Sequence, residues 1–249
     1  MSGPRHARIS ASALLLLPAL LLLASGCTEN NKSIFFGPNG ETIEFQDGLL
    51  PSQDYFGTRD AFLEDGPGLD EYNFGLVPAD TVGYRLLTSS SYESRFIIRT
   101  DLSILTDCAE IVRAELFLRV SLPSADSLLL EAYEATVPVV LPGTWLEGFG
   151  GLQGGVSWLT ADGSVRWEAE GGDLVGAPFD SATVRQDTVM SFVIPNGLVF
   201  RWIEEPYSNH GIVVRLAGTF PEEHILLHTR ESTIPAWRPR LLIEYIPGG

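Results

Sequence analysis

The sequence predicts an all-β domain, built as a two-sheet β-sandwich with one short helix. Three observations support this fold class. Short runs rich in β-branched and aliphatic residues recur along the chain, proline and glycine separate these runs, and only one segment has a helical period. The 249-residue chain is long enough to bury the core of one undivided sandwich.

The N-terminus carries an export pattern. Residues 5–8 include two arginines, residues 9–23 form an apolar run that is short for a membrane span, and residues 24–26 are small. Cys27 follows directly. This order resembles a bacterial lipoprotein signal peptide over residues 1–26, which implies that Cys27 becomes the acylated first residue. Ala24 stands where that family usually has a larger aliphatic residue, and an ordinary signal peptide with an incidental cysteine is the alternative.

This resemblance implies a location. Several acyl chains on one cysteine attach a protein stably to a membrane, so the membrane is the first expected partner. Thr28, in place of an aspartate after the cysteine, favours the outer membrane of a bacterial cell envelope in that family. Residues 27–56 are polar and contain glycine and proline. We interpret them as a tether that carries a domain over residues 57–249.

The charge of the chain limits its partners. Residues 1–26 hold two arginines and no acidic residue, so the mature chain keeps 14 basic and 32 acidic residues, a net charge of −18. A field of this sign repels phosphate backbones and excludes nucleic acid as a partner. The simpler explanation of this negative charge is that it keeps an exported protein soluble.

We count about eight or nine strand-like runs, and seven of them carry the prediction. Alternation is clearest in residues 111–121, where Leu116, Leu118 and Val120 share one face. The other six runs have similar composition, and proline or glycine lies in the gaps between them. They are residues 94–102, 127–137, 188–195, 210–218, 223–231 and 239–247.

One helix and one long loop region complete the predicted domain. Residues 196–206 place Leu198, Trp202 and Ile203 on one face, and Pro206 ends the helix. Residues 148–182 are rich in glycine and weakly patterned, and we expect them to form long loops.

Catalytic and metal-binding motifs are absent from the sequence. It has no G-x-S-x-G elbow, no Walker loop and no H-E-x-x-H, and residues 148–155 miss the dinucleotide-binding spacing. His224 and His228 lie on a predicted strand, where a spacing of four residues separates them by about 13 Å. The sequence therefore predicts no catalytic residue, no metal site and no cofactor. A calcium ion in a loop is left open, although no EF-hand spacing supports one.

Aromatic residues are the first ligand candidates, because a ring on a loop can stack on the apolar face of a sugar. Trp145, Trp158 and Trp202 are expected in the core. The aromatic residues in polar or proline-rich surroundings are expected to be exposed: Trp167, Tyr207 and Trp237.

Arginines near the C-terminus are the second ligand candidates. On one face they would form a groove for uronates, with bidentate contacts from guanidinium to carboxylate. The alternative is that they pair with nearby acids such as Glu231 and Glu244, so a neutral glycan is slightly preferred over alginate. The four arginines are Arg215, Arg230, Arg238 and Arg240.

An ordered series of short segments resembles the DNRLRE domain, a β-module related to alginate-type carbohydrate-binding modules and disaggregatase-related repeats. The resemblance implies a jelly-roll-like sandwich on exported proteins, usually non-catalytic, with Trp145, Glu147 and Trp158 as framework residues. The matching segments are residues 60–63, 73–75, 95–103, 109–120, 145–147, 156–158, 201–202, 208–215, 228–232 and 238–245.

The leading functional hypothesis is a lipid-anchored, non-catalytic envelope protein with a carbohydrate-binding-like module and a polysaccharide as partner. The first rival is a structural or adhesive envelope protein that binds a protein partner through exposed strand edges. The second is a polysaccharide-degrading enzyme with carboxylates brought together by loops.

Overall fold

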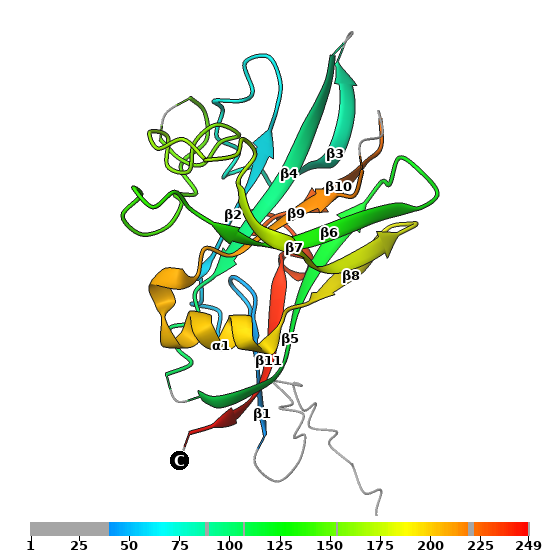
Figure 1. Ribbon diagram of the computed structural model, residues 1–249. Coiled ribbons are helices and arrows are strands. Elements are labelled where there is room, and N and C mark those ends of the chain that lie inside the picture. The colour runs from blue at the N-terminus through cyan, green and yellow to red at the C-terminus, as the bar shows by residue number, and fades with distance from the viewer. Residues whose placement is uncertain (1–39, 88–89, 107, 153, 219–221, 249) are drawn as a thin grey trace, which may run out of the picture. The chain divides into compact units, whose positions relative to one another are not determined.

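A computed structural model describes residues 40–248, apart from residues 88–89, 107, 153 and 219–221 (Figure 1). The signal peptide, Cys27 and the tether up to residue 39 lie outside these described residues. The domain is all-β and sandwich-like, with a single α-helix in the described range, as the sequence predicts. Its strands are β1 (Glu41–Phe45), β2 (Thr58–Glu64), β3 (Ala79–Leu87), β4 (Ser90–Thr100), β5 (Cys108–Ser121), β6 (Leu128–Thr136), β7 (Asp173–Val184), β8 (Thr188–Val193), β9 (Ile212–Leu216), β10 (His224–His228) and β11 (Arg240–Pro247).

All strand pairs are antiparallel and join into one hydrogen-bonded sheet. One half contains β7, β6, β9, β4 and β2, and the other contains β1, β11, β5 and β8. Strands β3 and β10 connect the halves, because the long strands β4 and β5 change partner along their length. Strand β4 pairs first with β3 and then with β9, and β5 pairs with β11 and then with β10. The two sheets expected from the sequence are therefore continuous at this corner.

The main core lies between the two halves and uses the alternating residues predicted from the sequence. Phe96 and Ile98 of β4 are buried there, as are Leu116, Leu118 and Val120 of β5. The seven predicted runs correspond to β4, β5, β6, β8, β9, β10 and β11. Alternate side chains of a strand point to the same face, so burial of that face places apolar residues at every second position. This alternation can be recognised in the sequence.

A second core covers the outer face of β2, β4 and β9. Leu63, Ile97 and Val213 point to this face and are fully buried. The loops of residues 137–172 pack over them and contribute Trp145, Trp158 and Trp167. These three strands are thus buried on both faces, which explains their continuous apolar runs. The loops are drawn in green to yellow-green beside β2 in Figure 1.

The glycine-rich segment in these loops is anchored by Asn73, a buried residue. Asn73 Nδ2 donates hydrogen bonds to the carbonyl oxygens of Glu147 and Val156, at 2.6 and 2.7 Å, and its Oδ1 accepts one from Gly150 N at 2.8 Å. Gly155 has φ +134°, and a Cβ there would lie 2.7 Å from Asn73 Nδ2. Glycine is therefore required by the close approach as well as by the backbone.

Three boundaries differ from the sequence prediction. The expected tether extends too far, because β1 pairs with β11 and Phe45 is buried in the main core. The loop expected over residues 148–182 is shorter than predicted, because it ends at residue 172 and β7 begins at Asp173. Strand β7 contains Gly176 and Pro178 and pairs only with β6, and an edge strand tolerates such residues. Strands β2 and β3 were also not predicted as strands from periodicity.

The predicted helix is confirmed as α1 (Asn196–Glu204). Leu198 and Trp202 are buried as expected, while Ile203 is half-buried. Helix α1 packs against β5, and Pro206 begins a 3-10 turn, η1 (Pro206–Ser208). A second 3-10 turn, η2 (Pro235–Trp237), precedes β11.

A buried carboxyl group at the end of β2 gives the stability of the fold a pH dependence. Glu64 is 1% exposed, and Arg85 Nη2 contacts its two carboxyl oxygens at 3.3 and 3.2 Å. Burial and then the charge of Asp80 raise the pKa of Glu64 from its ordinary 4.5 to about 7. The folded state therefore holds this proton up to a higher pH than the unfolded state does.

Because of this difference in pKa, we expect the free energy of unfolding to fall as the pH rises from about 4.5 to about 7. The titration of Glu64 should account for about 3 kcal/mol of that fall. Glu64→Gln keeps a neutral side chain of similar shape and should remove that part of the slope. Urea denaturation of both proteins between pH 4 and 8 measures it. Identical slopes for the two proteins would contradict the assignment to Glu64.

Candidate ligand-binding groove

A groove with a volume of about 530 Å³ lies between α1, η1 and the segment after β4. We call it the helix groove. Its polar lining comes from both sides, and its apolar lining includes Trp202, Ile203 and Pro206. The polar residues that line it are Arg99, Asp101, Ser103, Thr106, Glu204 and Asn209.

Arg99 is the cationic residue of this groove. It follows Ile98 on β4 and so projects from the outer face, directly opposite Arg59 of β2 in the strand register. Arg99 makes no hydrogen bond and no ion pair with the residues that the structure describes. Burial lowers its guanidinium pKa, the charge of Asp101 raises it, and the charge of Arg59 lowers it by a smaller amount. Two like charges opposite one another are unfavourable on a sheet, so Arg99 is well suited to bind an added acceptor.

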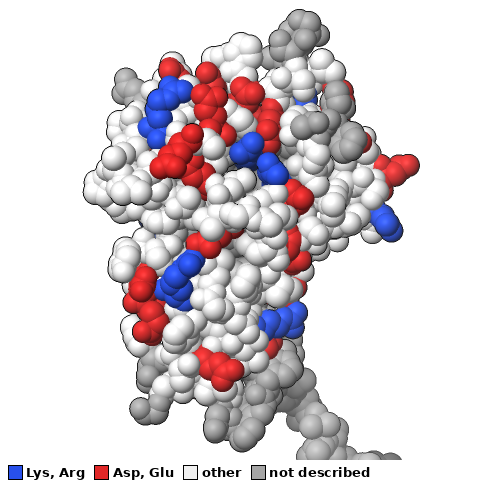
Figure 2. All heavy atoms as spheres, in the orientation of Figure 1, with Lys and Arg blue, Asp and Glu red and all other residues white. Residues whose placement is uncertain are grey.

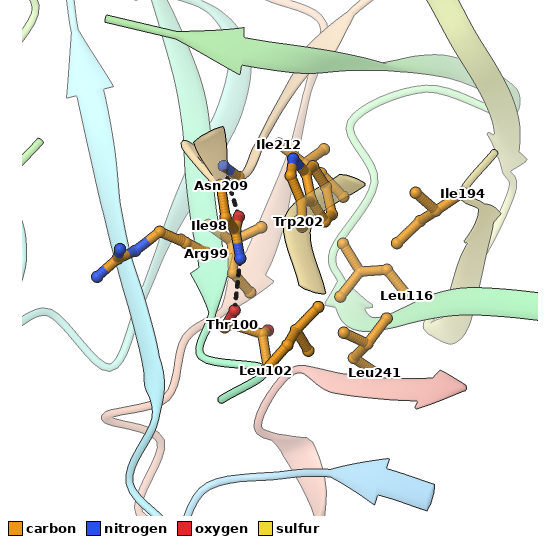
Figure 3. A pocket seen from close by; sticks show the side chains of 11 residues that line it. Ile98, Arg99, Thr100, Leu102, Leu116, Ile194, Trp202, Asn209, Ile212 and Leu241 are labelled. Carbon is orange, nitrogen blue, oxygen red and sulfur yellow. Dashed lines mark hydrogen bonds between the residues drawn. The ribbon is translucent and has the colours of Figure 1, made fainter. Parts of the chain in front are cut away.

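The wall behind the groove is rigid and apolar. Figure 3 shows Trp202 facing Leu116, Ile194 and other apolar side chains, with Arg99 extending away from them. The cavity that they enclose has a volume of only about 10 Å³ and cannot hold an organic ligand. Any ligand of this region therefore sits in the outer helix groove.

Asn209 fixes the edge of the groove. Its Nδ2 donates to the carbonyl oxygen of Thr100 at 2.9 Å, and its Oδ1 accepts a hydrogen bond from Gly211 N at 3.1 Å. Gly211 has φ +83°, and a Cβ there would lie 2.1 Å from the carbonyl oxygen of Ile98. This close approach ties the loop after η1 to the end of β4, so the groove is preformed.

The carboxylates of Asp101 and Glu204 add acceptors to the groove. Asp101 Oδ1 accepts a hydrogen bond from Ser103 N at 2.9 Å, while Glu204 is exposed at the end of α1. One guanidinium, two carboxylates and an amide offer both donors and acceptors to a ligand rich in hydroxyl groups.

The aromatic candidates do not come together. Trp167 is buried, and its Nε1 donates to the carbonyl oxygen of Ser157 at 2.9 Å, so the expectation of an exposed ring is wrong. The polar residues around it belong to a turn that covers the second core. Trp237 is half-buried, and its ring packs against His228 at 4.7 Å and under Arg119 at 5.4 Å. Tyr207 is 73% exposed and follows Pro206, which lines the helix groove.

The four arginine candidates are all engaged with other groups, and two of them, Arg230 and Arg238, meet at Asp47. Arg215 donates hydrogen bonds to Tyr133 and Glu131, and Arg230 donates to Glu147 and Asp47. Arg238 donates to two backbone carbonyl oxygens. Arg240 donates to Glu44, and its guanidinium lies over the ring of Phe117. The alternative of pairing with acids is correct for three of them, including Arg230 with Glu231. In Figure 2, basic atoms lie beside acidic ones on the face shown.

A buried carboxylate cluster is the main feature that the sequence does not reveal. Asp60 of β2, Glu147 of the long loop and Glu231 after β10 place carboxylate oxygens within 4.8 Å of one another. Arg230 Nε contacts Glu147 Oε1 at 2.7 Å and Glu231 Oε1 at 2.8 Å. Glu147 thus links the long loop to the segment after β10 through Arg230. The three acids are too far apart in sequence to form a recognisable motif.

The histidine pair lies on strand β10, as the sequence predicts. His228 is hydrogen-bonded to Ser121 Oγ at 3.1 Å, and burial lowers its pKa. In the part of the chain that the structure describes, no helix is long and apolar enough to cross a bilayer.

The sequence did not distinguish the residues of the helix groove from other surface residues. Arg99 ends an alternating run and Asn209 precedes Gly211 in a loop after the helix, and both features are common in surface segments. The groove forms only because α1 folds back beside β4. No family model and no curated protein matches this chain.

Proposed function

We propose that this protein is a non-catalytic, carbohydrate-binding-like module of a bacterial cell envelope, anchored to the outer membrane through acylated Cys27. The helix groove is the observation that carries the proposal. It is preformed by Asn209 and Gly211, and its guanidinium, Arg99, has no hydrogen-bond or ion-pair partner among the described residues. Its volume of about 530 Å³ is large enough for about one or two sugar rings. The sequence resemblance to the DNRLRE domain supports the same class of ligand.

The charges in the groove favour a neutral glycan. Asp101 and Glu204 would repel a uronate carboxylate and can accept hydrogen bonds from neutral sugar hydroxyls. The net charge of −18 expected for the mature chain adds to this repulsion at low salt. Tyr207, beside Pro206 at the edge of the groove, is the aromatic residue best placed to stack on a ring.

Affinity electrophoresis tests this function. The full chain in detergent is run in gels containing laminarin, galactomannan, xylan, pectate or alginate. We expect retardation in at least one neutral gel, insensitive to salt, and no release of reducing sugar from that polysaccharide. Salt-sensitive retardation by uronates alone would contradict the neutral preference, and release of reducing sugar would contradict the non-catalytic assignment.

Lipidation is a separate prediction. Cys27→Ser is expected to abolish acylation and cleavage at the lipoprotein site, and any chain that another peptidase releases should leave the detergent phase, because it carries no acyl chains. Detergent phase partitioning of the two proteins from a bacterial host measures it. A variant that matures normally and stays membrane-bound would contradict the anchor.

The second candidate function is an adhesive envelope protein. The observation that favours it is a set of exposed apolar side chains in the loops over the second core. Val139 is 95% exposed and Phe149 is 88% exposed, and Val140 and Leu152 are also exposed. Such side chains suit a protein partner. Retardation in none of the polysaccharide gels would leave this function as the better account.

A further inference from the structure

The carboxylate cluster has more acceptors than the surrounding donors satisfy. Glu147 is well supplied, because its Oε1 accepts from Asp60 N at 2.9 Å and its Oε2 from Arg230 Nη2 at 2.9 Å. Asp60 Oδ2 accepts from Arg230 N at 2.8 Å. Asp60 Oδ1 and Glu231 Oε2, however, accept no hydrogen bond from an N–H or hydroxyl group of the described residues, although both atoms are buried. The two carboxyl groups lie within hydrogen-bonding reach of each other, so either a shared proton or a cation could join them.

Burial makes these two oxygens informative. Asp60 is 1% exposed, and a buried carboxylate oxygen without a partner is strongly unfavourable. The site therefore favours a positive charge placed between Asp60 and Glu231.

The charges around the cluster do not balance. Asp47 joins the three acids through Arg230 Nη1 at 3.2 Å, which gives four carboxylates. The arginines ion-paired with them are Arg230 and Arg59, and Arg59 Nε lies 3.7 Å from Glu147 Oε2. Four carboxyl groups therefore meet two ion-paired arginines, so acceptors are in excess around these side chains.

We propose that Asp60, Glu147 and Glu231 bind one Ca²⁺ ion. Oxygens on opposite sides of an ion are separated by up to twice the ion–oxygen distance. For Ca²⁺, with distances of about 2.3–2.6 Å, this separation reaches about 4.6–5.2 Å, and for Mg²⁺, with about 2.0–2.1 Å, only about 4.2 Å. The three oxygens lie within 4.8 Å of one another, a spacing that one Ca²⁺ ion can span.

The bound ion would join three distant parts of the chain. Asp60 belongs to β2, Glu147 to the loop over the second core and Glu231 to the segment before η2. Binding only to the folded state stabilises that state, so Ca²⁺ fastens the long loop to the sheet. None of the three proposed ligands lines the helix groove, and the proposal does not depend on glycan binding.

Calorimetric titration with CaCl2 tests the proposal on the full chain in detergent, after dialysis against EGTA. We expect one site per chain, a melting temperature raised by about 5 °C or more at a hundredfold excess over Kd, and much weaker binding of MgCl2. Asp60→Asn and Glu231→Gln should each weaken Ca²⁺ binding about 10-fold or more. Glu170→Gln is the matched control, because Glu170 is exposed and pairs only with exposed Arg166.

Two outcomes would overturn the proposal. The first is no heat and no melting shift with CaCl2 in the wild type, a result that does not depend on whether the variants fold. The second is equal Ca²⁺ binding by wild type, Asp60→Asn and Glu231→Gln. If Ca²⁺ fails to bind and Asp60→Asn is more stable than wild type at alkaline pH, a proton shared by Asp60 and Glu231 fills the role assigned to the ion.

Discussion

Replacing Trp158 by alanine is expected to lower the free energy of unfolding by about 3–5 kcal/mol, the range for large aromatic truncations in cores. Trp158 is buried in the second core, and the guanidinium of Arg95 lies 4.7 Å from the centre of its ring. Gly171 packs so closely that a Cβ there would lie 2.7 Å from the indole. Trp145→Ala should have an effect of the same size, because Trp145 is buried and its Nε1 donates to His210 O at 2.8 Å.

Urea denaturation of both variants measures this effect. Tyr207→Ala is the control, since Tyr207 is exposed and its removal should change stability by less than about 0.5 kcal/mol. An unchanged midpoint for Trp158→Ala would mean that the loops of residues 137–172 do not form a core, and would return Trp158 to the set of ligand candidates.

Replacing Arg230 by methionine is expected to have a similarly large effect, about 3–5 kcal/mol, because breaking a buried ion pair leaves uncompensated charge. Arg230 contacts Glu147, Glu231 and Asp47, and its backbone N–H donates to Asp60. Methionine keeps the length of the side chain and removes its charge. The measurement is urea denaturation at neutral pH in EGTA, so that a bound cation does not contribute.

The control for this variant is Arg166→Met. Arg166 pairs with Glu170 at 3.0 Å on the surface, and exposed pairs contribute at most about 1 kcal/mol. Equal effects of the two substitutions would show that the Arg230 network is not buried in solution.

The fold class was predictable because the alternation of apolar and polar residues along a strand indicates which side chains face the core. Leu116, Leu118 and Val120 repeat every second residue, and the strand follows directly. Strand β1 was missed because five residues carry too short a pattern to separate a strand from a polar tether. Strand β7 was missed because its glycine and proline are tolerated only at a sheet edge, and the edge position is a property of the assembled sheet.

The candidate sites were less predictable for a related reason. Trp167 looked exposed because Arg166, Glu168 and Glu170 surround it, yet one turn can bury a ring between polar neighbours. The acids of the cluster come from three segments joined only by tertiary packing. Arg99, like Arg185, has no hydrogen bond or ion pair with a described residue, and such partners cannot be read from a single sequence.

The helix groove and the carboxylate cluster have separate expected effects. Substitutions at Arg99 or Glu204 should change ligand binding with little effect on stability, because neither side chain makes a hydrogen bond to a described residue. Substitutions at Asp60 or Arg230 should change stability first. This separation allows the proposed binding site to be tested in a folded protein.

The most direct test compares wild type with the double variant Arg99→Gln and Glu204→Gln by affinity electrophoresis in the neutral polysaccharide gel that retards the wild type most. The matched control exchanges an ion pair elsewhere, Arg240→Gln with Glu44→Gln. We expect the groove variant to bind about 10–100-fold more weakly, as loss of charged hydrogen-bonding groups implies, and the control to bind like wild type. Equal retardation of all three proteins, or no retardation of the wild type by any neutral polysaccharide, would contradict glycan binding in the helix groove.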